Sequence, residues 1–323
     1  MKITSKHLSV LYDLTAEQFN AVEMHSFLNL INLIQMQLEF LKMETGKKEL
    51  FDEILGETND MVREIRKSEK NRFFPENLKS YQKKVIDLIT YIEKETEDDE
   101  LTHGIQESRD VLLEIFRVLD IRAEELKRHV SHPGQWLSYS VEEFINDFNT
   151  FFHAVEKNSK GRYRIVQNIA NQEPNDYLIH FEVDSELDGL VTMPVIFKDV
   201  IRDLIANARK YTEPGGRIHV GVYQKKNLLR FIVEDNGMGI PKNELDHIFE
   251  YGYRATNVRH LPTMGGGFGL TKALYVTVQL NGDLWIDSEE DNGTKIKIEI
   301  PVPEKFVKTG LKKTNISSES GKE

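Results

Sequence analysis

The spacing of apolar residues changes once along the chain. From residue 8 to about residue 160 they recur with the helical period, which is typical of helices packed into a bundle. Beyond that point apolar and polar residues alternate, which is the period of a half-buried strand. We therefore expect a helical amino half and a carboxyl half that contains a sheet.

Local signals divide the amino half into helices. Thr15 and Gln18 form a capping box, so a helix is expected to begin at Ala16. It runs to about Lys42, before Gly46 breaks the pattern. Further helices are expected at about 47–70, 76–97, 98–130 and 140–157.

The first helix has no polar side over much of its length. From Phe27 to Met43 its apolar residues point in almost every direction around the axis. Such a helix has to be covered on several sides, in a bundle or by a second chain. We expect a bundle that a second copy of the chain completes, which would make the protein a homodimer.

The carboxyl half alternates between strand and helix patterns. Strands are expected at 163–169, 177–183, 217–223, 228–234, 283–288 and 294–300. Helices are expected at about 194–211, 241–249 and 269–280. Strands with their helices segregated to one face form an α/β sandwich with a mixed sheet.

The fold class predicted from these patterns is an amino-terminal helical bundle followed by an α/β-sandwich domain. The segment His132-Pro133-Gly134 marks the boundary between them. We assign residues 8–135 to the helical domain, 136–303 to the sandwich domain and 304–323 to a disordered tail.

The composition narrows the classes of partner. The 323 residues include 42 basic and 53 acidic side chains, and the net charge of −11 argues against binding of nucleic acid by neutralisation of its phosphates. Cysteine is absent, which excludes disulfides, thiolate catalysis and cysteine metal sites. No run of about 18 apolar residues occurs, so we expect no membrane insertion and a cytoplasmic location.

Two clusters of glycine precede predicted helices. Gly237 and Gly239 follow Asp235 at the end of a predicted strand, and a second cluster spans residues 265–269. Helix amino ends with bare backbone amides are sites for phosphate groups. The spacing fits neither a P-loop nor a dinucleotide fingerprint. A phosphate-bearing ligand is therefore expected, in a nucleotide fold of another kind.

Three segments carry a family resemblance. Residues 203–212 (DLIANARKYT), 233–241 (VEDNGMGIP) and 264–272 (MGGGFGLTK) follow one another in this order. They resemble the N, G1 and G2 boxes of the GHKL ATP-binding domain, which sensor histidine kinases share with mitochondrial dehydrogenase kinases, type II topoisomerases and mismatch-repair ATPases. The resemblance covers residues 140–303 and implies an α/β sandwich that binds ATP and Mg²⁺. Residues 284–289 and the helical amino half resemble sensor histidine kinases in particular.

The resemblance implies roles for residues around the adenine. Asp235 would accept a hydrogen bond from the adenine amino group, while Gly237 and Gly239 let the backbone pass close to the ligand. Tyr211 would lie near the base. Thr294 resembles the threonine that supports the adenine site, although an ordinary strand threonine is nearly as good an interpretation.

The resemblance also implies roles at the phosphates. Asn207 would coordinate Mg²⁺ through its carbonyl oxygen, and Asp203, one turn earlier, would contact the ion or its water. A core asparagine with ordinary partners is the simpler alternative for Asn207. The remaining phosphate contacts are assigned to Lys210, to Arg254 in a lid over residues 250–266, and to the amides around Gly265, Gly267 and Gly269.

His25 is the candidate phosphoacceptor. The sequence from His25 to Ile34, with Asn29 four residues after the histidine, resembles the dimerisation helix of one histidine-kinase class. On a helix His25, Asn29 and Asn32 form a polar strip that we expect to be exposed. The resemblance makes His25 the phosphoacceptor and Asn29 the residue that orients water for dephosphorylation of the partner. A purely structural histidine is the alternative.

One position departs from the family. Glu or Asp usually follows the phosphoacceptor, where a carboxylate takes the imidazole proton during attack on the γ-phosphate. This chain has Ser26 instead, so autokinase activity stays open. Glu23 is no substitute, because two residues along a helix point to nearly opposite sides.

The resemblance implies a function with two alternatives. The first is an ATP-dependent histidine kinase that autophosphorylates His25 and passes the phosphate to, or removes it from, the aspartate of a response-regulator receiver domain. The extra helices at 47–130 are also similar to the larger helical domain of the mitochondrial dehydrogenase kinases, which phosphorylate serine. The third possibility is a non-catalytic ATP-binding regulatory dimer.

Overall fold

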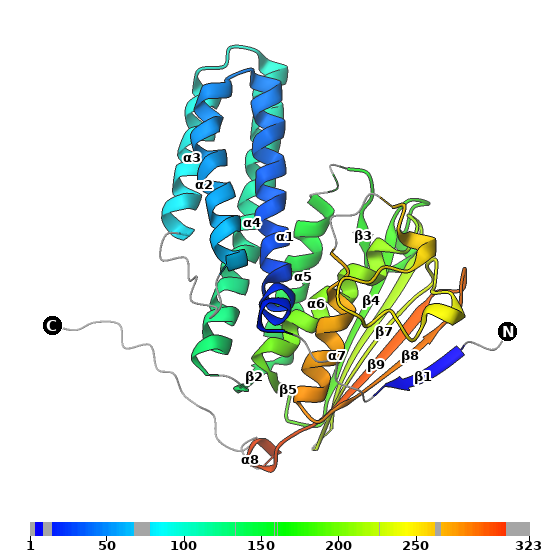
Figure 1. Ribbon diagram of the computed structural model, residues 1–323. Coiled ribbons are helices and arrows are strands. Elements are labelled where there is room, and N and C mark those ends of the chain that lie inside the picture. Colours follow the sequence, from blue (N-terminus) through cyan, green and yellow to red (C-terminus); the bar gives the residue numbers. More distant parts are fainter. Residues whose placement is uncertain are drawn as a thin grey trace.

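The protein has two structural parts, which the computed structural model describes over residues 4–8, 15–67, 78–132, 134–157, 159, 161–225, 227–261 and 266–307. A tall bundle of helices stands beside a domain in which helices cover one face of a sheet (Figure 1). The predicted fold class, a helical bundle followed by an α/β sandwich, is confirmed.

Four helices form the bundle: α1 (Ala16–Thr45), α2 (Lys48–Lys67), α3 (Leu78–Lys94) and α4 (Asp99–Ser131). Their described ends agree with the predicted ones to within about one turn. The ends predicted at residues 70 and 76 lie outside the described residues.

Both ends of α1 are fixed by the local signals read from the sequence. Thr15 Oγ1 accepts a hydrogen bond from the Gln18 amide at 3.2 Å, and the Thr15 amide donates to Gln18 Oε1 at 2.9 Å. The helix ends at Gly46, which adopts a left-handed φ of 66° and donates its amide to the Lys42 carbonyl at 3.1 Å.

Helices of the same chain cover the apolar side chains of α1. Ile31, Ile34, Leu38 and Leu41 are fully buried in a core to which α2, α3 and α4 contribute. Each helix packs on the next one along the chain, and α1 also packs on α4. The bundle therefore closes within one chain, as in up-and-down four-helix bundles. A bundle is confirmed, and a second copy is not needed to complete it.

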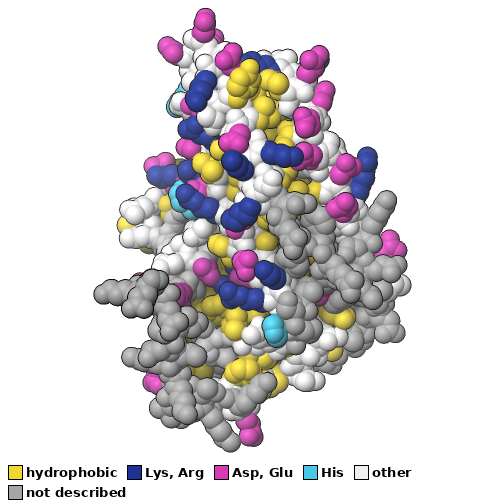
Figure 2. Space-filling model, turned by 90° about the vertical axis from the view of Figure 1, so that its left-hand side faces the viewer, with side chains coloured by type: hydrophobic (Ala, Val, Ile, Leu, Met, Phe, Trp, Pro, Cys, Tyr) yellow, Lys and Arg dark blue, Asp and Glu magenta, His cyan; other side chains and the backbone are white. Residues whose placement is uncertain are grey.

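The outer surface of the bundle is mixed in character. Figure 2 shows one of its faces, on which hydrophobic side chains lie between basic and acidic ones. Met36, Phe40 and Met43 of α1 are among the exposed large apolar side chains of the described residues. Homodimerisation stays a prediction.

None of the described helices combines the length and apolar character needed to cross a bilayer.

The carboxyl half is built on a seven-stranded sheet with the order β1-β8-β9-β7-β6-β4-β3. β3, β4 and β6 are parallel to one another, and the other neighbouring pairs are antiparallel. Its strands are β1 (Thr4–Leu8), β3 (Ile165–Val166), β4 (Tyr177–Ser185), β6 (Arg217–Lys225), β7 (Leu228–Asp235), β8 (Asp283–Ser288) and β9 (Thr294–Pro301).

Three helices lie between this sheet and the bundle (Figure 1). They are α5 (Val141–Lys157), α6 (Val195–Lys210) and α7 (Gly269–Gln279). The capping box predicted at the start of α5 is present, because the Glu143 amide donates to Ser140 Oγ and the Ser140 amide to Glu143 Oε2, both at 3.1 Å. The predicted mixed sheet with helices on one face is confirmed.

Three strands were not expected from the sequence. β1 pairs with β8 in antiparallel register, from Thr4 opposite Ser288 to Leu8 opposite Leu284. β2 (Trp136–Ser140) pairs with β5 (Leu190–Pro194) in a separate two-stranded sheet. The stretch from residue 8 to 160 is therefore not helical throughout. Both pairings join segments far apart in sequence, so no local pattern marks them.

Two predicted elements are shorter or different. In place of a helix at 241–249 there is a 3₁₀ helix over Lys242–Glu244, followed by turns. The turns bury Leu245 and Phe249 while the Glu244 carboxylate bonds to the segment around Thr256, which a regular helix would not permit. The strand at 163–169 is reduced to β3 because a 3₁₀ helix begins at Ile169.

The end of the chain is also partly ordered. The segment predicted as a disordered tail begins with a short helix, α8 (Glu304–Val307). The ring of Phe306 stacks on that of Trp136, with centroids 5.7 Å apart. Residues 308–323 lie outside the described part.

Candidate nucleotide and phosphotransfer site

A pocket with about 680 Å³ of empty space lies between α6, the end of β7, the lid and the start of α7. Six residues predicted from the sequence line it together: Asn207, Tyr211, Asp235, Gly239, Arg254 and Thr294. Apolar side chains form the rest of the wall: Leu204, Ala208, Val233, Ile240, Ile248, Tyr253, Ala255, Val258, Leu270 and Ile296.

Asp235 is the buried acid of this pocket. Burial raises the pKa of its carboxyl to about 6, although hydrogen bonds from the backbone of Gly237 and Thr294 oppose the shift. The Gly237 amide donates to Asp235 Oδ1 at 2.9 Å. A carboxylate in an apolar pocket is suited to accept a hydrogen bond from an amino group of a planar ligand.

The two glycines after Asp235 are explained by the protein's own backbone. A Cβ on Gly237 would lie 2.2 Å from the Tyr211 carbonyl oxygen. Gly239 has a φ of 60°, and a Cβ there would lie 1.9 Å from the Glu289 carbonyl oxygen. Both positions therefore exclude a side chain even before a ligand is considered.

Asn207 lies where α6 meets α7. A Cβ on Gly269 would lie 2.8 Å from Asn207 Nδ2, so the first turn of α7 packs directly on this amide. Gly267, with a φ of 76°, directs the chain into that turn. The structure thus brings the N and G2 boxes into contact at one end of the pocket. Gly265 lies outside the described residues.

Asp203 has a protein partner that the sequence did not suggest. Its Oδ2 lies 3.3 Å from Lys272 Nζ, and both side chains are buried. Asp203 is not part of the pocket lining. A magnesium contact by Asp203 stays a prediction, and Lys272 would compete for the same carboxylate.

The basic residues of the site have distinct surroundings. Burial lowers the pKa of Lys210 to about 8, and the neighbouring cations Arg254 and Arg209 add to the shift. Arg254 Nη2 donates to the carbonyls of Val258 at 2.7 Å and Leu261 at 3.2 Å, which holds the lid. Arg254 Nε is buried without a partner among the described residues. An anionic ligand in the pocket would supply one.

Glu244 holds the lid through hydrogen bonds. Its Oε2 accepts hydrogen bonds from the Tyr253 hydroxyl at 2.7 Å and from the Thr256 amide at 2.9 Å. Burial acts to raise the pKa of Glu244, but these hydrogen bonds from Thr256 and Tyr253 lower it overall. The described lid residues, up to Leu261, are therefore tied to the body of the domain.

His25 lies beside this site. Its ring meets the Phe268 ring edge to face, with centroids 4.9 Å apart and planes at 76°. Phe268 caps α7 immediately before Gly269. The distance from Asn29 Nδ2 to His25 Nε2 is 3.1 Å, so the predicted histidine–asparagine pair is formed. Both side chains are half-buried against the sandwich domain rather than on an open strip.

The surroundings of His25 favour the neutral ring. Burial lowers its pKa; the carboxylates of Asp203 and Asp199 oppose this effect, whereas the cations Lys272 and Lys210 reinforce it. The tautomer of the ring and the orientation of the Asn29 amide decide which of the two groups donates in this contact. Neutral imidazole with a free electron pair is the nucleophilic form.

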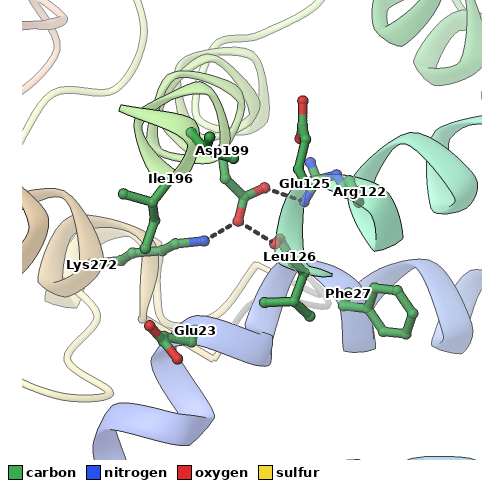
Figure 3. A pocket seen from close by; sticks show the side chains of 10 residues that line it. Glu23, Phe27, Arg122, Glu125, Leu126, Ile196, Asp199 and Lys272 are labelled. Atoms are coloured by element: carbon green, nitrogen blue, oxygen red, sulfur yellow. Dashed lines mark hydrogen bonds and ion pairs between the residues drawn. The ribbon is translucent and has the colours of Figure 1, made fainter. Parts of the chain in front are cut away.

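Ser26, the position that departs from the family, is joined to a charge cluster around Asp199, whose contacts with Lys272 and Arg122 are drawn in Figure 3. Ser26 Oγ donates to Asp199 Oδ2 at 2.9 Å. The Lys272 ammonium binds the same carboxylate oxygen, and Arg122 Nη1 lies 3.0 Å from Asp199 Oδ1. Burial acts to raise the pKa of Asp199, but the cations Lys272 and Arg122 hold it well below its usual range.

The sequence contained an unused signal for this cluster. Asp199, Asp203 and Asn207 recur every four residues along one side of α6. Lys272 follows the last glycine of the G2 box. Their contact with Ser26 and Arg122 depends on how the bundle packs on the sandwich domain, which no local pattern specifies.

Comparison with known proteins shows what the sandwich domain is similar to. Residues 193–304 match the family described as histidine kinase-, DNA gyrase B-, and HSP90-like ATPase. The match covers less than half of the chain. The resemblance of the N, G1 and G2 boxes is thereby confirmed, and we refer to the sandwich as the ATPase domain.

The curated relatives are sensor histidine kinases. The sensor histidine kinase WalK of Bacillus subtilis is 21% identical over 286 residues, which cover 85% of this chain and 43% of WalK. The sensor histidine kinase RppB of Synechocystis is 35% identical over 103 residues, 32% of this chain and 23% of RppB. The chain thus spans less than half the length of these relatives. The WalK alignment is longer than the ATPase domain, so it extends into the bundle.

Solved structures of histidine kinases also match this chain. The catalytic domain of histidine kinase ThkA is 21% identical, and the match covers 52% of this chain and 95% of that domain with a TM-score of 0.37. The mycobacterial sensor histidine kinase MprB is 24% identical, with a TM-score of 0.37 over 51% of this chain and 97% of that one.

Proposed function

We propose that this protein is an ATP-dependent histidine kinase of a two-component-type system. It autophosphorylates His25 and passes the phosphate to, or removes it from, the aspartate of a response-regulator receiver domain. One observation carries the proposal: His25 packs on Phe268, and the next residue along, Gly269, packs on Asn207 in the nucleotide pocket. The candidate acceptor thus lies beside the end of the pocket formed by the N and G2 boxes.

In this proposal ATP lies in the pocket with its adenine at Asp235 and its phosphates toward the start of α7. Asp235 binds the adenine amino group at the buried end, and Tyr211 and Thr294 line the same pocket. Lys210, Arg254 and the amides at the start of α7 bind the phosphates. Asn207 offers a hard oxygen ligand for Mg²⁺, which when bound neutralises charge on the phosphates.

The first chemical step is attack by the neutral imidazole of His25 on the γ-phosphorus. A nitrogen–phosphorus bond forms, the bond from the γ-phosphorus to the bridging oxygen breaks, and ADP leaves with that oxygen. The ring then loses the proton of its other nitrogen to water. Asp199 is a poor proton acceptor, because its pKa is held low by Lys272 and Arg122. Asp199 therefore does not compensate for the absence of an acid at position 26.

The second step consumes the phosphohistidine. A receiver aspartate attacks the phosphorus, the nitrogen–phosphorus bond breaks, and an acyl phosphate forms on the partner. Asn29 contacts the ring nitrogen of His25, so it is placed to orient a water molecule that hydrolyses the acyl phosphate of the receiver to aspartate and inorganic phosphate. We further propose that the protein works as a homodimer, using exposed apolar residues such as Phe40 of α1.

Incubation of the pure protein with γ-labelled ATP and Mg²⁺ tests the proposal. Acid-labile label that His25→Gln removes is the expected result. Acid-stable label on serine would show instead a serine kinase of the mitochondrial dehydrogenase-kinase type. Nucleotide binding without label of either kind would identify a non-catalytic regulator. Sedimentation of the same protein at several concentrations tests the homodimer.

A further inference from the structure

A continuous set of contacts within one chain leads from His25 to the nucleotide pocket. Phe268 touches the histidine ring, and Gly269 touches Asn207 in the pocket lining. Lys272, one turn further along α7, interacts electrostatically with His25 and is paired with Asp203 of α6. Every member of this set belongs to the same copy of the protein.

Asp199 joins three other helices at this point (Figure 3). Its carboxylate contacts Ser26 of α1, Arg122 of α4 and Lys272 of α7. Ser26, Arg122 and Lys272 are at most 8% exposed. Buried charges are costly unless they are paired, so losing one partner disturbs all the helices that the cluster joins.

The cluster lies at the edge of an open pocket between the bundle and the ATPase domain. This pocket is lined by Glu23 and Ser26 of α1, by Arg122 and Glu125 of α4, and by Asp199 and Lys272 of the ATPase domain. Polar pairs around it also join the two parts, including Glu125 of α4 with Arg202 of α6 at 3.0 Å. Through Ser26, Asp199 links α1 directly to the ATPase domain.

We infer that His25 is phosphorylated by the nucleotide bound in its own chain, with Asp199 as the residue that positions α1 for this transfer. The inference rests on the proposed histidine kinase function and adds two features to it. Phosphoryl transfer occurs within one copy, whether or not the protein dimerises. Asp199 acts through Ser26 and Lys272 on the placement of the ring and does not touch the nucleotide.

A complementation experiment tests transfer within one chain. One variant carries His25→Gln with an intact nucleotide pocket, and the other carries Asn207→Ala with His25 intact. The two are co-expressed with different tags, purified as mixed samples and incubated with γ-labelled ATP. We expect no more label on the Asn207→Ala chain than it acquires alone, and a wild-type rate per molecule that is unchanged by dilution.

The outcomes separate the inference from the function on which it rests. Label on the Asn207→Ala chain that appears only in the mixture would show transfer between copies, which overturns the inference and leaves the kinase intact. A specific rate that rises with protein concentration would overturn it too. Wild-type protein without acid-labile label would instead refute the proposed function itself.

The positioning role of Asp199 has its own test. Asp199→Asn should lower the rate constant of autophosphorylation by about 10²-fold, the size of effect expected from a small misplacement of reacting groups. The affinity for ATP, measured by calorimetry, should stay the same, and Asp199→Glu should recover part of the rate. Ser26→Ala is a milder variant if Asp199→Asn does not fold. Asp60→Asn, which removes an exposed partner of Arg63 on the bundle, is the matched control.

Equal losses of rate and ATP affinity in Asp199→Asn would show a general structural role and overturn the positioning role. So would a wild-type rate in folded Asp199→Asn.

A second site, on the other face of the sheet, is independent of the nucleotide pocket. His180 of β4 lies directly opposite His219 of β6, and their rings stack with centroids 5.1 Å apart and planes at 16°. Glu182 follows two residues later on the same face. Its Oε2 lies 3.9 Å from His180 Nε2 and 3.8 Å from His219 Nε2, and Tyr223 donates to it at 3.2 Å.

We propose that these three side chains bind a divalent transition metal of the zinc type. One ligand atom from each lies within 4.8 Å of the others, so modest side-chain rotation would bring them to the distances of about 2.0–2.2 Å that zinc needs. Two imidazoles and a carboxylate are a suitable ligand set for such ions. Tyr223 donates to Oε2, the carboxylate oxygen that is nearest to both histidines, and so helps to orient it.

Titration of the protein with Zn²⁺ alone, followed by calorimetry above pH 7, tests the site. We expect binding of one equivalent that weakens by about 10-fold or more in His180→Ala and in His219→Ala, since each removes one ligand. His247→Ala, which removes an exposed histidine paired with Glu250, should bind as the wild type does. Equal affinity of wild type and His180→Ala would overturn the proposal, as would the absence of binding.

Discussion

The two halves of α1 have different surroundings. In the distal half, toward Gly46, the fully buried side chains are mainly apolar, as at Ile34, Leu38 and Leu41, and Gln37 is the polar exception. In the proximal half, toward the ATPase domain, the buried side chains include the polar residues Asn20 and Ser26. Burying a large apolar side chain stabilises a protein by about 1.5–3 kcal/mol, whereas burying a polar one costs free energy unless it is paired. The distal half of α1 thus contributes mainly to the stability of the fold. The buried polar side chains of the proximal half contribute mainly by fixing the position of the helix.

The largest effect is expected at His25. His25→Gln should remove all acid-labile label, because no other described histidine lies beside both Phe268 and Lys272. The free energy of unfolding should change by less than about 1 kcal/mol, since the side chain is only half-buried. Label and urea unfolding are measured on the same preparation. A His25→Gln variant that still becomes labelled would show that another residue is the phosphoacceptor. The proximal half of α1 would then not carry the reacting group.

Leu38→Ala addresses the distal half. It should lower the free energy of unfolding by about 2–5 kcal/mol, because it opens a cavity in a fully buried core. The rate of labelling per folded molecule should not change. Met43→Ala is the control on the same helix, because Met43 is 81% exposed and its loss should be nearly neutral. A slower reaction in folded Leu38→Ala would mean that the distal half also sets the position of His25.

Asp235 is a comparable polar group in the ATPase domain, because its ionised carboxyl lowers the stability of the folded protein. Its pKa in the folded protein is raised to about 6 from 3.8, so its contribution to stability is present below about pH 4 and is lost as the pH rises through 6. Asp235→Asn should therefore be more stable than the wild type at pH 7.5 by about 1–2 kcal/mol, after allowance for partial exposure.

Urea unfolding of Asp235→Asn and wild type at pH 4 and pH 7.5 measures this difference. The gap between the two proteins should widen with pH, and Asp235→Asn should bind ATP more weakly than the wild type at both values. A gap that is the same at both pH values would show that the carboxyl is not destabilised by burial.

The smallest effect is expected at Phe268. An edge-to-face ring pair contributes about 0.5–1.5 kcal/mol, so Phe268→Ala should slow labelling of His25 by roughly 2- to 12-fold. Tyr91→Ala, at a half-exposed ring on the bundle, is the matched control and should react at the wild-type rate. A Phe268→Ala protein with the wild-type rate would show that the ring contact does not help to place the histidine.

Much of the site could be predicted from the sequence, because local sequence patterns mark the ends of the elements that form it. Capping residues fix the starts of α1 and α5, and the three boxes place Asn207, Asp235 and Gly269 at element ends that the sheet brings together. The pair of His25 and Asn29 followed from helical spacing alone. Periodicity and turn chemistry act within a few residues, and these features depend on nothing more distant.

The features that were missed depend on distant partners. Asp199 and Lys272 continue the patterns of α6 and of the G2 box, but their contacts form only when α1 and α4 pack on the ATPase domain. The turns after Glu244 contain a helical pattern of apolar residues, but the carboxylate of Glu244 bonds to the lid instead. In each case a tertiary contact outweighs the local preference.

The pairing of β1 with β8 has a consequence for how the chain is made. On a ribosome β1 emerges long before the segment that pairs with it, Leu284–Ser288. The bundle can fold on its own contacts during this interval, because its four helices follow one another in sequence. The edge of the sheet is closed only after the ATPase domain is complete. β1 therefore remains without its sheet partner until the strands of the ATPase domain have been made, and its pairing marks the completion of that sheet.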